Sequence, residues 1–260
     1  MRHELNAVLA IAHRDLLKFL RDRGRLISTF IFPIIFIAIL GSSFQSNLGG
    51  LSGFDFLAYT FTGVLGQTLF QSATDGVISL IDDRENDFSQ EMFVSPISRY
   101  SIVLGKICGE SLVALSQGIG VVLFGLIMGV QISPSQVAAL VPVALVICLF
   151  GGSFGVLIMS NLSSRRLAQQ IFPFVMLPQF FLAGVFNPIK VLPLPLDILS
   201  HISPMRYAVD LARGAFYTGQ QDYSAVVLLA PAVNLAIMAG MFALFLGTGT
   251  FLFVRRERSR

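Results

Sequence analysis

The sequence has few of the residues on which most catalytic and metal sites depend. Its 260 residues include three histidines, two cysteines and no tryptophan. Cys108 and Cys148 fall in apolar runs, which indicates buried thiols rather than a disulfide framework or a metal site. The histidines (His3, His13 and His201) are far apart, and the HExxH and nucleophile-elbow motifs are absent. We therefore expect no catalytic residues and no metal site.

A phosphate-binding loop is also missing. The nearest approach is Gly105-Lys106, where the motif would require glycine in place of Tyr100 and serine or threonine in place of Ile107. We expect this chain alone to bind no cofactor and to hydrolyse no ATP.

Charged residues are scarce as well. They make up 13% of the chain, against about 25% in soluble domains. Hydrophobic residues make up 54%, and the mean hydropathy is +0.75. This number of charged residues is too small to cover the surface of a soluble protein. The sequence therefore predicts an integral membrane protein. The net charge of +3 is then a matter of membrane orientation and does not indicate a nucleic-acid partner.

The apolar runs are of helical length and do not alternate as the strands of a membrane barrel would. They predict an all-α integral membrane fold, a single domain over residues 1–260. Six transmembrane helices are expected, near 26–44, 56–81, 101–130, 136–160, 167–186 and 225–254. Pairs of glycines four residues apart, Gly105/Gly109, Gly125/Gly129 and Gly151/Gly155, permit close helix approach.

The positive charges indicate how the spans are oriented. With the N-terminus inside, 15 of the 18 Lys and Arg residues lie in inside segments, and Lys190, Arg206 and Arg213 lie outside. This asymmetry follows the positive-inside rule, so we expect both termini, including the tail 255–260, in the cytoplasm. Residues 1–25 are too charged for a signal peptide. They predict an amphipathic helix at the membrane surface, its apolar face formed by Leu5, Val8, Leu9, Ala12, Leu16 and Leu20.

Polar residues within the spans mark candidate functional positions. The second span has a polar stripe at helical spacing, Thr60, Gly63, Gln67, Gln71 and Thr74. Such a stripe faces either a pathway or a partner helix. Asp75 and Glu110 are the acids placed inside spans. Asp75 lies about two turns from Asp82, and Glu110 one turn from Lys106, so salt bridges or interfacial water are at least as well supported as a proton relay.

The fifth span contains Pro173 and Pro178, which should bend it. Such bends are typical of helices that line a pathway, so Phe174 and Gln179 beside them are candidate pathway residues. The outer segment that follows, 187–224, is too apolar for a free loop. It predicts two short helices, Leu194–Ile202 and Met205–Phe216, that re-enter the outer leaflet. Arg206, Asp210 and Arg213 stand one turn apart in the second, so they can pair.

The charged segment 82–100 interrupts this apolar chain. From Phe88 its pattern is that of a short helix, with Phe88, Met92 and Phe93 on one face, and Pro96 ends it before Arg99. Exposed Met and Phe side chains on such a helix require a partner surface. Glu91 can meet a basic rim on that partner. The alternative is a charged loop that folds onto the membrane base of its own chain and needs no partner.

These features together resemble the ABC-2 type permeases, the membrane subunits of ATP-binding cassette exporters. The resemblance covers essentially the whole chain and depends mainly on "REND-FSQEMFVSPISRYSIVLGK" and "ISPMRYAVDLARGAFY". It implies that Phe88–Ile97, within the coupling segment 82–100, is the coupling helix that docks in a groove on a separate ABC ATPase subunit, which binds ATP and Mg²⁺. It also implies a second permease chain, which is either a copy of this chain or a paralogue. Both chains would lie in the inner (plasma) membrane, with membrane lipids around them.

The resemblance implies export of an amphiphilic drug, a lipid or a lipid-linked glycan. Sugar pathways often use Trp and Tyr, and the chain has 24 Phe, 5 Tyr and no Trp, which favours a drug or a lipid. Two other classes remain open. An ion-coupled secondary transporter usually has ionisable residues at the bilayer midplane and inverted repeats, and a non-transporting scaffold needs neither a polar stripe nor a broken span.

Overall fold

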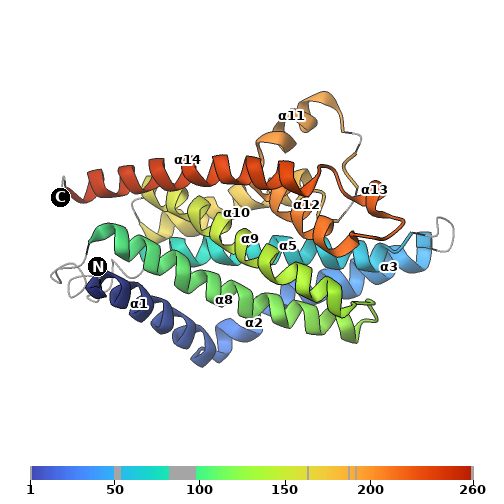
Figure 1. Ribbon diagram of the computed structural model, residues 1–260, viewed down its shortest axis with the longest axis horizontal. Helices are drawn as coiled ribbons and strands as arrows, with labels where there is room; N and C mark the ends of the chain where they lie inside the picture. Colours follow the sequence, from blue (N-terminus) through green and yellow to red (C-terminus); the bar gives the residue numbers. More distant parts are fainter. Residues whose placement is uncertain are drawn as a thin grey trace.

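A computed structural model describes residues 2–49, 54–81, 98–162, 164–186, 188–190 and 192–258. All regular structure in these ranges is helical, and the long helices lie lengthwise in one bundle (Figure 1). The helices are α1 (Arg2–Arg21), α2 (Arg23–Ile35), η1 (Phe36–Gly41), α3 (Ser42–Phe44), η2 (Gln45–Gly49), α5 (Phe56–Ile78), α8 (Arg99–Ile127), α9 (Pro134–Asn161), α10 (Arg165–Leu182), α11 (Leu194–Ile202), α12 (Pro204–Tyr217), α13 (Tyr223–Val226) and α14 (Pro231–Arg258). α1 begins and α14 ends at the same end of the bundle.

Within the described ranges, four segments are long and apolar enough to cross a membrane: Arg23–Asn47, Tyr100–Ile127, Pro134–Asn161 and Tyr223–Phe253. They correspond to the first, third, fourth and sixth predicted spans. The second and fifth, α5 and α10, do not reach the same hydropathy. α5 contains many hydroxyl and amide side chains, and α10 contains three glutamines and begins with two arginines. The six-span layout therefore stays a prediction.

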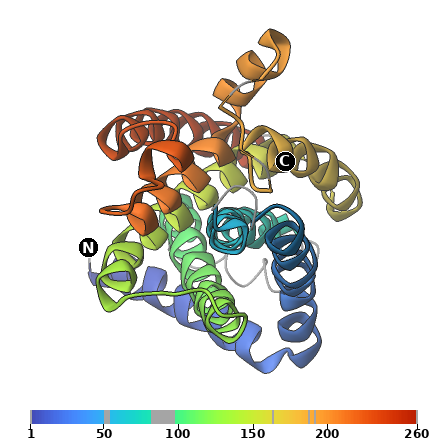
Figure 2. The ribbon, with the colours of Figure 1, turned by 90° about the vertical axis from the view of Figure 1, so that its right-hand side faces the viewer.

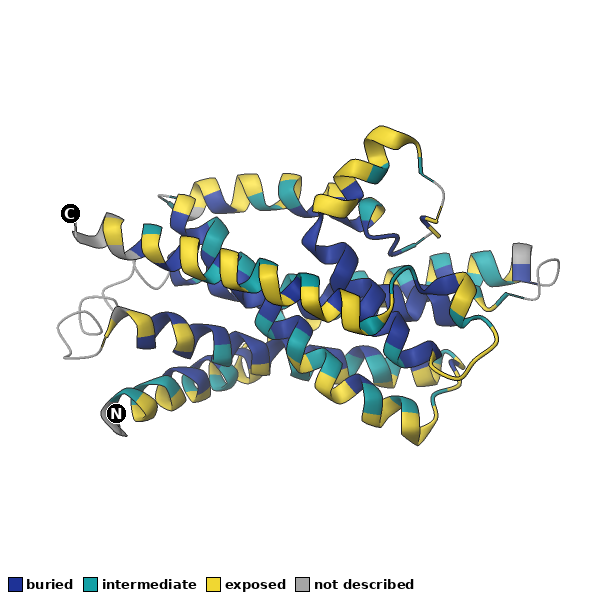
Figure 3. Ribbon diagram, turned by 45° about the horizontal axis from the view of Figure 1, so that its top comes forward, coloured by how far each residue is buried: buried dark blue, intermediate teal, exposed yellow. Residues whose placement is uncertain are grey.

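α5 lies in the middle of the bundle, as the end-on view shows (Figure 2). Of its 23 residues, 18 are buried, and it is among the darkest helices when residues are coloured by burial (Figure 3). Its closest approach is to α9, where a Cβ at Gly151 would overlap the backbone carbonyl oxygen of Phe70 and one at Gly155 would lie 2.6 Å from that of Thr74. The Thr74 hydroxyl donates to the Gly151 carbonyl at 3.0 Å. The protein thus replaces lipid around α5, which lets this helix hold polar groups.

α1 packs along α8 with a face that differs from the predicted one. Ile11, Ala12, Asp15 and Phe19 are buried, while Leu5, Leu9 and Leu20 are about half exposed. Of the six residues predicted to form the apolar face, only Ala12 is buried. The exposed leucines still form an apolar stripe beside the buried one, as an interfacial helix requires. Periodicity alone did not show the packed stripe because the acid Asp15 interrupts it.

The first predicted span is irregular in a way that the sequence analysis missed. Pro33 lies inside α2, and the chain then widens into the π-helical turns η1 and η2. Proline removes a backbone hydrogen bond, and π-helical turns are frequent at functional sites. The first predicted span therefore departs from regular α-helical hydrogen bonding, whereas α5 is one continuous α-helix.

The outer segment contains helices within two residues of the predicted bounds, although re-entry into the membrane stays a prediction. α11 projects from the bundle with exposed leucines and isoleucines (Figures 1 and 3). α12 instead enters the bundle, and 13 of its 14 residues are buried.

The charged residues of α12 do not pair with one another as predicted. Asp210 accepts from the backbone N–H groups of Leu228 and Leu229 at 2.7 and 2.9 Å. Arg213 donates to the Gly184 carbonyl at 2.7 Å and stacks at 3.8 Å from the Tyr59 ring centroid. Arg206 donates to the Ser200 hydroxyl at 2.7 Å. Each residue therefore ties α12 to a different neighbouring segment.

Candidate functional site

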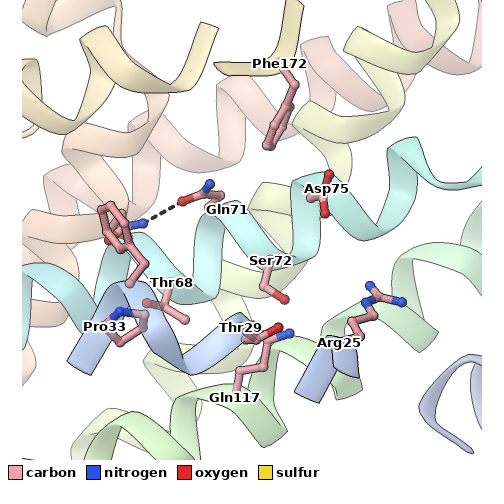
Figure 4. Close-up of a pocket in the computed structure, with 11 residues that line it drawn as sticks. Arg25, Thr29, Pro33, Thr68, Gln71, Ser72, Asp75, Gln117 and Phe172 are labelled. Atoms are coloured by element: carbon pink, nitrogen blue, oxygen red, sulfur yellow. Dashed lines mark hydrogen bonds between the residues drawn. The ribbon is translucent and has the colours of Figure 1, made fainter. Parts of the chain in front are cut away.

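A polar cavity of about 360 Å³ lies between α2, α5, α8 and α10 (Figure 4). Its lining combines amides and hydroxyls with one cation, one acid, two phenylalanines and a proline. The lining residues are Arg25, Thr29, Phe32, Pro33, Gln67, Thr68, Gln71, Ser72, Asp75, Gln117 and Phe172. We call this space the polar cavity. A polar space inside an otherwise apolar helix bundle is costly unless water or a ligand fills it.

α5 supplies nearly half of the lining through Gln67, Thr68, Gln71, Ser72 and Asp75. These positions recur at three- and four-residue intervals, so they form one helix face. Two of them, Gln67 and Gln71, belong to the predicted polar stripe, and Asp75 is one of the two predicted intramembrane acids. Thr68 and Ser72 were missed, although the same spacing would have included them.

The other predicted pathway residues do not line the polar cavity. Thr60 is fully buried, and Thr74 faces α9, where its hydroxyl is bound. Gln179 is buried against the start of α12, accepting at 3.3 Å from Ser203 Oγ and Met205 N. Phe174 is 81% exposed on the outside of α10. The residue of α10 that reaches the polar cavity is Phe172 (Figure 4).

Two buried polar atoms in the lining have no protein hydrogen-bond partner among the described residues. They are Gln67 Oε1 and Thr68 Oγ1, on side chains only 2% and 6% exposed. Gln67 Nε2 donates to Gln71 Oε1 at 2.5 Å, which orients the amide and leaves its oxygen as an acceptor. Unsatisfied buried polar atoms cost about 1–3 kcal/mol each. The polar cavity is therefore prepared for a ligand or water that brings hydrogen-bond donors.

One end of the polar cavity carries charge. Asp75 is the only exposed residue between Phe56 and Ile78 of α5, and Arg25 reaches the cavity from the first turn of α2. The α2 terminus is set by Asp22, whose carboxylate accepts from the Arg25 backbone N–H at 3.0 Å. Two helices thus present opposite charges to one space.

A buried charge network lies behind Arg25. Lys106 Nζ is 2.9 Å from Glu110 Oε1 and 3.1 Å from Asp15 Oδ2, and all three side chains are at most 3% exposed. Arg14 pairs with Asp15 at 2.6 Å, and Arg25 Nη2 lies 3.8 Å from Glu110 Oε2. We call these five residues the Lys106 network. It holds α1 and α2 on α8, and it shows Glu110 in a salt bridge, one of the two interpretations left open above.

A series of aromatic ring contacts begins at Phe32 in the lining of the polar cavity. Phe32 of the lining lies 5.6 Å from Phe180, and Phe36 stacks on Phe186 at 4.5 Å, centroid to centroid. These ring contacts join α2 to α10, and η1 to the segment that follows α10.

The predicted coupling residues Phe88, Glu91, Met92, Phe93 and Pro96 lie outside the described residues. Arg99 opens α8, whose first turn is capped by the Ser98 hydroxyl, which accepts from Ser101 N at 3.1 Å. In the part of the chain that the structure describes, no group of three or more His, Cys, Asp or Glu side chains could hold a metal ion.

Comparisons with known proteins agree with this description. The family model for ABC-2 type transporters matches residues 6–217. An inferred transport permease, ycf38 of Cyanophora paradoxa, is 24% identical over 213 residues, covering 80% of this chain and 73% of its own. The inner membrane transport permease YadH of Escherichia coli K12 is 26% identical over 198 residues, covering 73% and 76%. An inferred multidrug ABC transporter permease of the same bacterium, YbhR, is 31% identical over 140 residues, covering 52% and 37%.

Proposed function

We propose, because the chain belongs to the ABC-2 type transporter family, that it is the membrane subunit of an ATP-driven exporter. In this proposal it moves an amphiphilic drug, a lipid or a lipid-linked glycan outward. A separate ABC ATPase subunit binds ATP and Mg²⁺ and hydrolyses the nucleotide. The permease itself is embedded in the inner (plasma) membrane with both termini in the cytoplasm, as the distribution of Lys and Arg favours.

The polar cavity is the observation that carries this proposal. It offers amides and hydroxyls to a polar group and Phe32 and Phe172 to an apolar one, which is what an amphiphile requires. Arg25 and Asp75 line it, and in this proposal the Phe32/Phe180 and Phe36/Phe186 ring pairs close it on the other side. This arrangement suits a state open toward the cytoplasm, in which export requires those rings to part.

A second permease chain is proposed to complete the pathway. The apolar faces of α2 and α10 beside the polar cavity are exposed, including Ile27, Ile31, Phe174 and Leu177. A polar cavity that opened directly onto lipid would leave its amides unsatisfied. A second copy, or a paralogue, packed on these faces would close the cavity from the side.

The proposal is tested by purifying the chain together with a candidate ATPase and measuring ATP hydrolysis in lipid vesicles. We expect the pair to copurify and hydrolysis to rise when an amphiphilic substrate is added, whereas the permease alone releases no phosphate. A permease that moves substrate with an ion gradient and without any ATPase would contradict the proposal and support the ion-coupled alternative.

We expect replacement of Gln67 and Gln71 by Leu to impair transport severely while insertion stays normal. The two amides form the hydrogen-bonded pair in the wall of the polar cavity, and Leu favours membrane insertion. Transport in vesicles and the amount of folded protein are measured side by side. Thr248→Leu, at an exposed position of α14, is the control; unchanged transport in the double variant would make the amides structural only.

We expect Met92→Ala/Phe93→Ala to weaken ATPase binding or to uncouple hydrolysis from transport. Buried apolar anchors in an interface often contribute about 2 kcal/mol or more each, which is roughly a thirtyfold loss of affinity. Copurification and substrate-stimulated hydrolysis are the measurements. Arg255→Ala, exposed near the end of α14, should do far less; equal effects at both sites would place the docking surface elsewhere.

A further inference from the structure

Among the residues that the structure describes, one cation and one anion line the polar cavity, contributed by different helices. Arg25 comes from α2 and Asp75 from α5, and the other described lining residues are neutral (Figure 4). Charges in a low-dielectric space are costly unless something compensates them. The chemistry of these two side chains therefore bears directly on which ligands the cavity accepts.

Arg25 is the most weakly held cation of the Lys106 network. Glu110 already has Lys106 at 2.9 Å, whereas Arg25 is 3.8 Å away. The network combines three cations, Arg14, Lys106 and Arg25, with two acids, Asp15 and Glu110. The Arg25 side chain is also 32% exposed, while Lys106 is 3% exposed. Arg25 can therefore turn to an anionic ligand group without leaving an acid of the network unpaired.

Asp75 has the complementary character. It is exposed although α5 is otherwise closely packed, and it lines the polar cavity together with Ser72 and Gln71. Asp75 has an interaction within the protein, which a ligand cation would share or replace. A carboxylate in this position attracts a cationic group and repels an anionic one.

We propose, on the basis of the transport function proposed above, that the polar cavity binds a zwitterionic amphiphile. Its anionic group lies at Arg25 and its cationic group at Asp75. The polar atoms Gln67 Oε1 and Thr68 Oγ1, which lack protein partners, accept hydrogen bonds from the ligand or its water. Its hydrocarbon part lies against Phe32, Pro33 and Phe172. A singly charged amphiphile gains one attraction and meets one repulsion, so the zwitterion is preferred.

The absence of tryptophan allows a direct binding measurement. In a Phe172→Trp variant, the introduced indole is the only one in the chain and lies in the wall of the polar cavity. The purified chain, in micelles of a neutral maltoside detergent, is titrated with nitroxide-labelled amphiphiles of equal chain length. Four head groups are compared: phosphocholine, a carboxylate betaine, trimethylammonium and carboxylate. Phe251→Trp, at an exposed position of α14 outside the cavity, measures quenching that comes from the micelle alone.

We expect both zwitterionic probes to quench the cavity indole with an apparent Kd about fivefold or more below that of either singly charged probe. In this background, Asp75→Asn should remove the preference over the carboxylate probe, and Arg25→Gln the preference over trimethylammonium. Arg25→Lys keeps the charge and should keep most of the preference if Arg25→Gln disturbs folding. Arg21→Gln and Asp222→Asn change charges that do not line the cavity and should leave all four affinities unchanged.

If phosphocholine is the only probe that binds, the site is assigned to zwitterions with a phosphate head group, such as those of lipids. If the betaine binds as tightly as phosphocholine, the site is assigned to zwitterions of either kind. Equal quenching by all four probes, or binding of a singly charged probe as tightly as the zwitterions, would overturn the inference. Binding is measured without an ATPase. Zwitterion binding without ATP-driven transport would therefore refute the proposed function alone, and transport without a zwitterion preference would refute this inference alone.

Discussion

Replacing Lys106 by Met is expected to lower the free energy of unfolding by about 3–5 kcal/mol, the usual cost of leaving a buried charge without its partner. Lys106 is 3% exposed and lies within 3.1 Å of both Asp15 and Glu110. Its loss removes the cation that the two buried acids share and leaves Asp15 with Arg14 and Glu110 with the more distant Arg25. The melting temperature in detergent and the recovery of monodisperse protein are the measurements.

A matched set of variants separates this explanation from a general packing defect. Lys106→Met combined with Asp15→Asn and Glu110→Gln removes both acids and should recover a large part of the lost stability. Lys18→Met, at an exposed position of α1, should change stability little. A Lys106→Met protein that melts with the parent would show that the Lys106 network does not hold α1 to the bundle.

The second large effect is expected at the contact between α5 and α9. Gly151→Ala should destabilise the bundle by about 1–3 kcal/mol, the range for inserting a methyl group into a closely packed site. The added Cβ would overlap the backbone carbonyl of Phe70, which no side-chain rotation can relieve, and it would also disturb the Thr74 hydrogen bond to Gly151. Thermal unfolding monitored by circular dichroism is a suitable measurement.

Gly240→Ala is the control for this substitution. Gly240 lies in α14, and a Cβ there would have no neighbour within 4 Å. Alanine favours a helix over glycine by about 1 kcal/mol, so this variant should be as stable as the parent or more stable. Equal destabilisation by both variants would mean that the cost lies in the substitution itself and not in the contact between the two helices.

Much of the fold could be predicted from the sequence, because apolar runs and their helical spacing are local properties. The helices near 194–202 and 204–217 begin and end within two residues of the predicted bounds. What an isolated run cannot show is whether lipid or protein surrounds it. α5 is buried by its neighbours, and in the described part of the chain four segments qualify as spans by hydropathy, so the six-span layout stays a prediction. The ion pairs expected within α12 were wrong because Arg206, Asp210 and Arg213 each found a closer partner on another element.

The candidate site was predictable only in part. Periodicity identified a polar side of α5 and included Gln67 and Gln71, but the cavity face is turned toward Thr68, Ser72 and Asp75. The glycines of α9 determine that rotation, since they draw Thr74 onto α9. Arg25 was counted among the positive charges that flank the first span. A charge count cannot tell whether such a residue faces the cytoplasm or lines a cavity. Phe172 and Phe174 lie two residues apart in α10, and only the packed helix shows which one points inward.

The Lys106 network also has a consequence for the order in which the protein is made. Asp15 is synthesised with the first helix, but its buried partner Lys106 belongs to α8, which follows α2, η1 and α5 along the chain. Until α8 is synthesised, Asp15 has Arg14 beside it on α1 but lacks Lys106, and an acid with half of its partners is more stable near water than inside the bundle. We therefore expect α1 to stay at the membrane surface during synthesis and to dock once α5 and α8 are in place. Assembly of the N-terminal helix is then a late event, although its residues are the first to be translated.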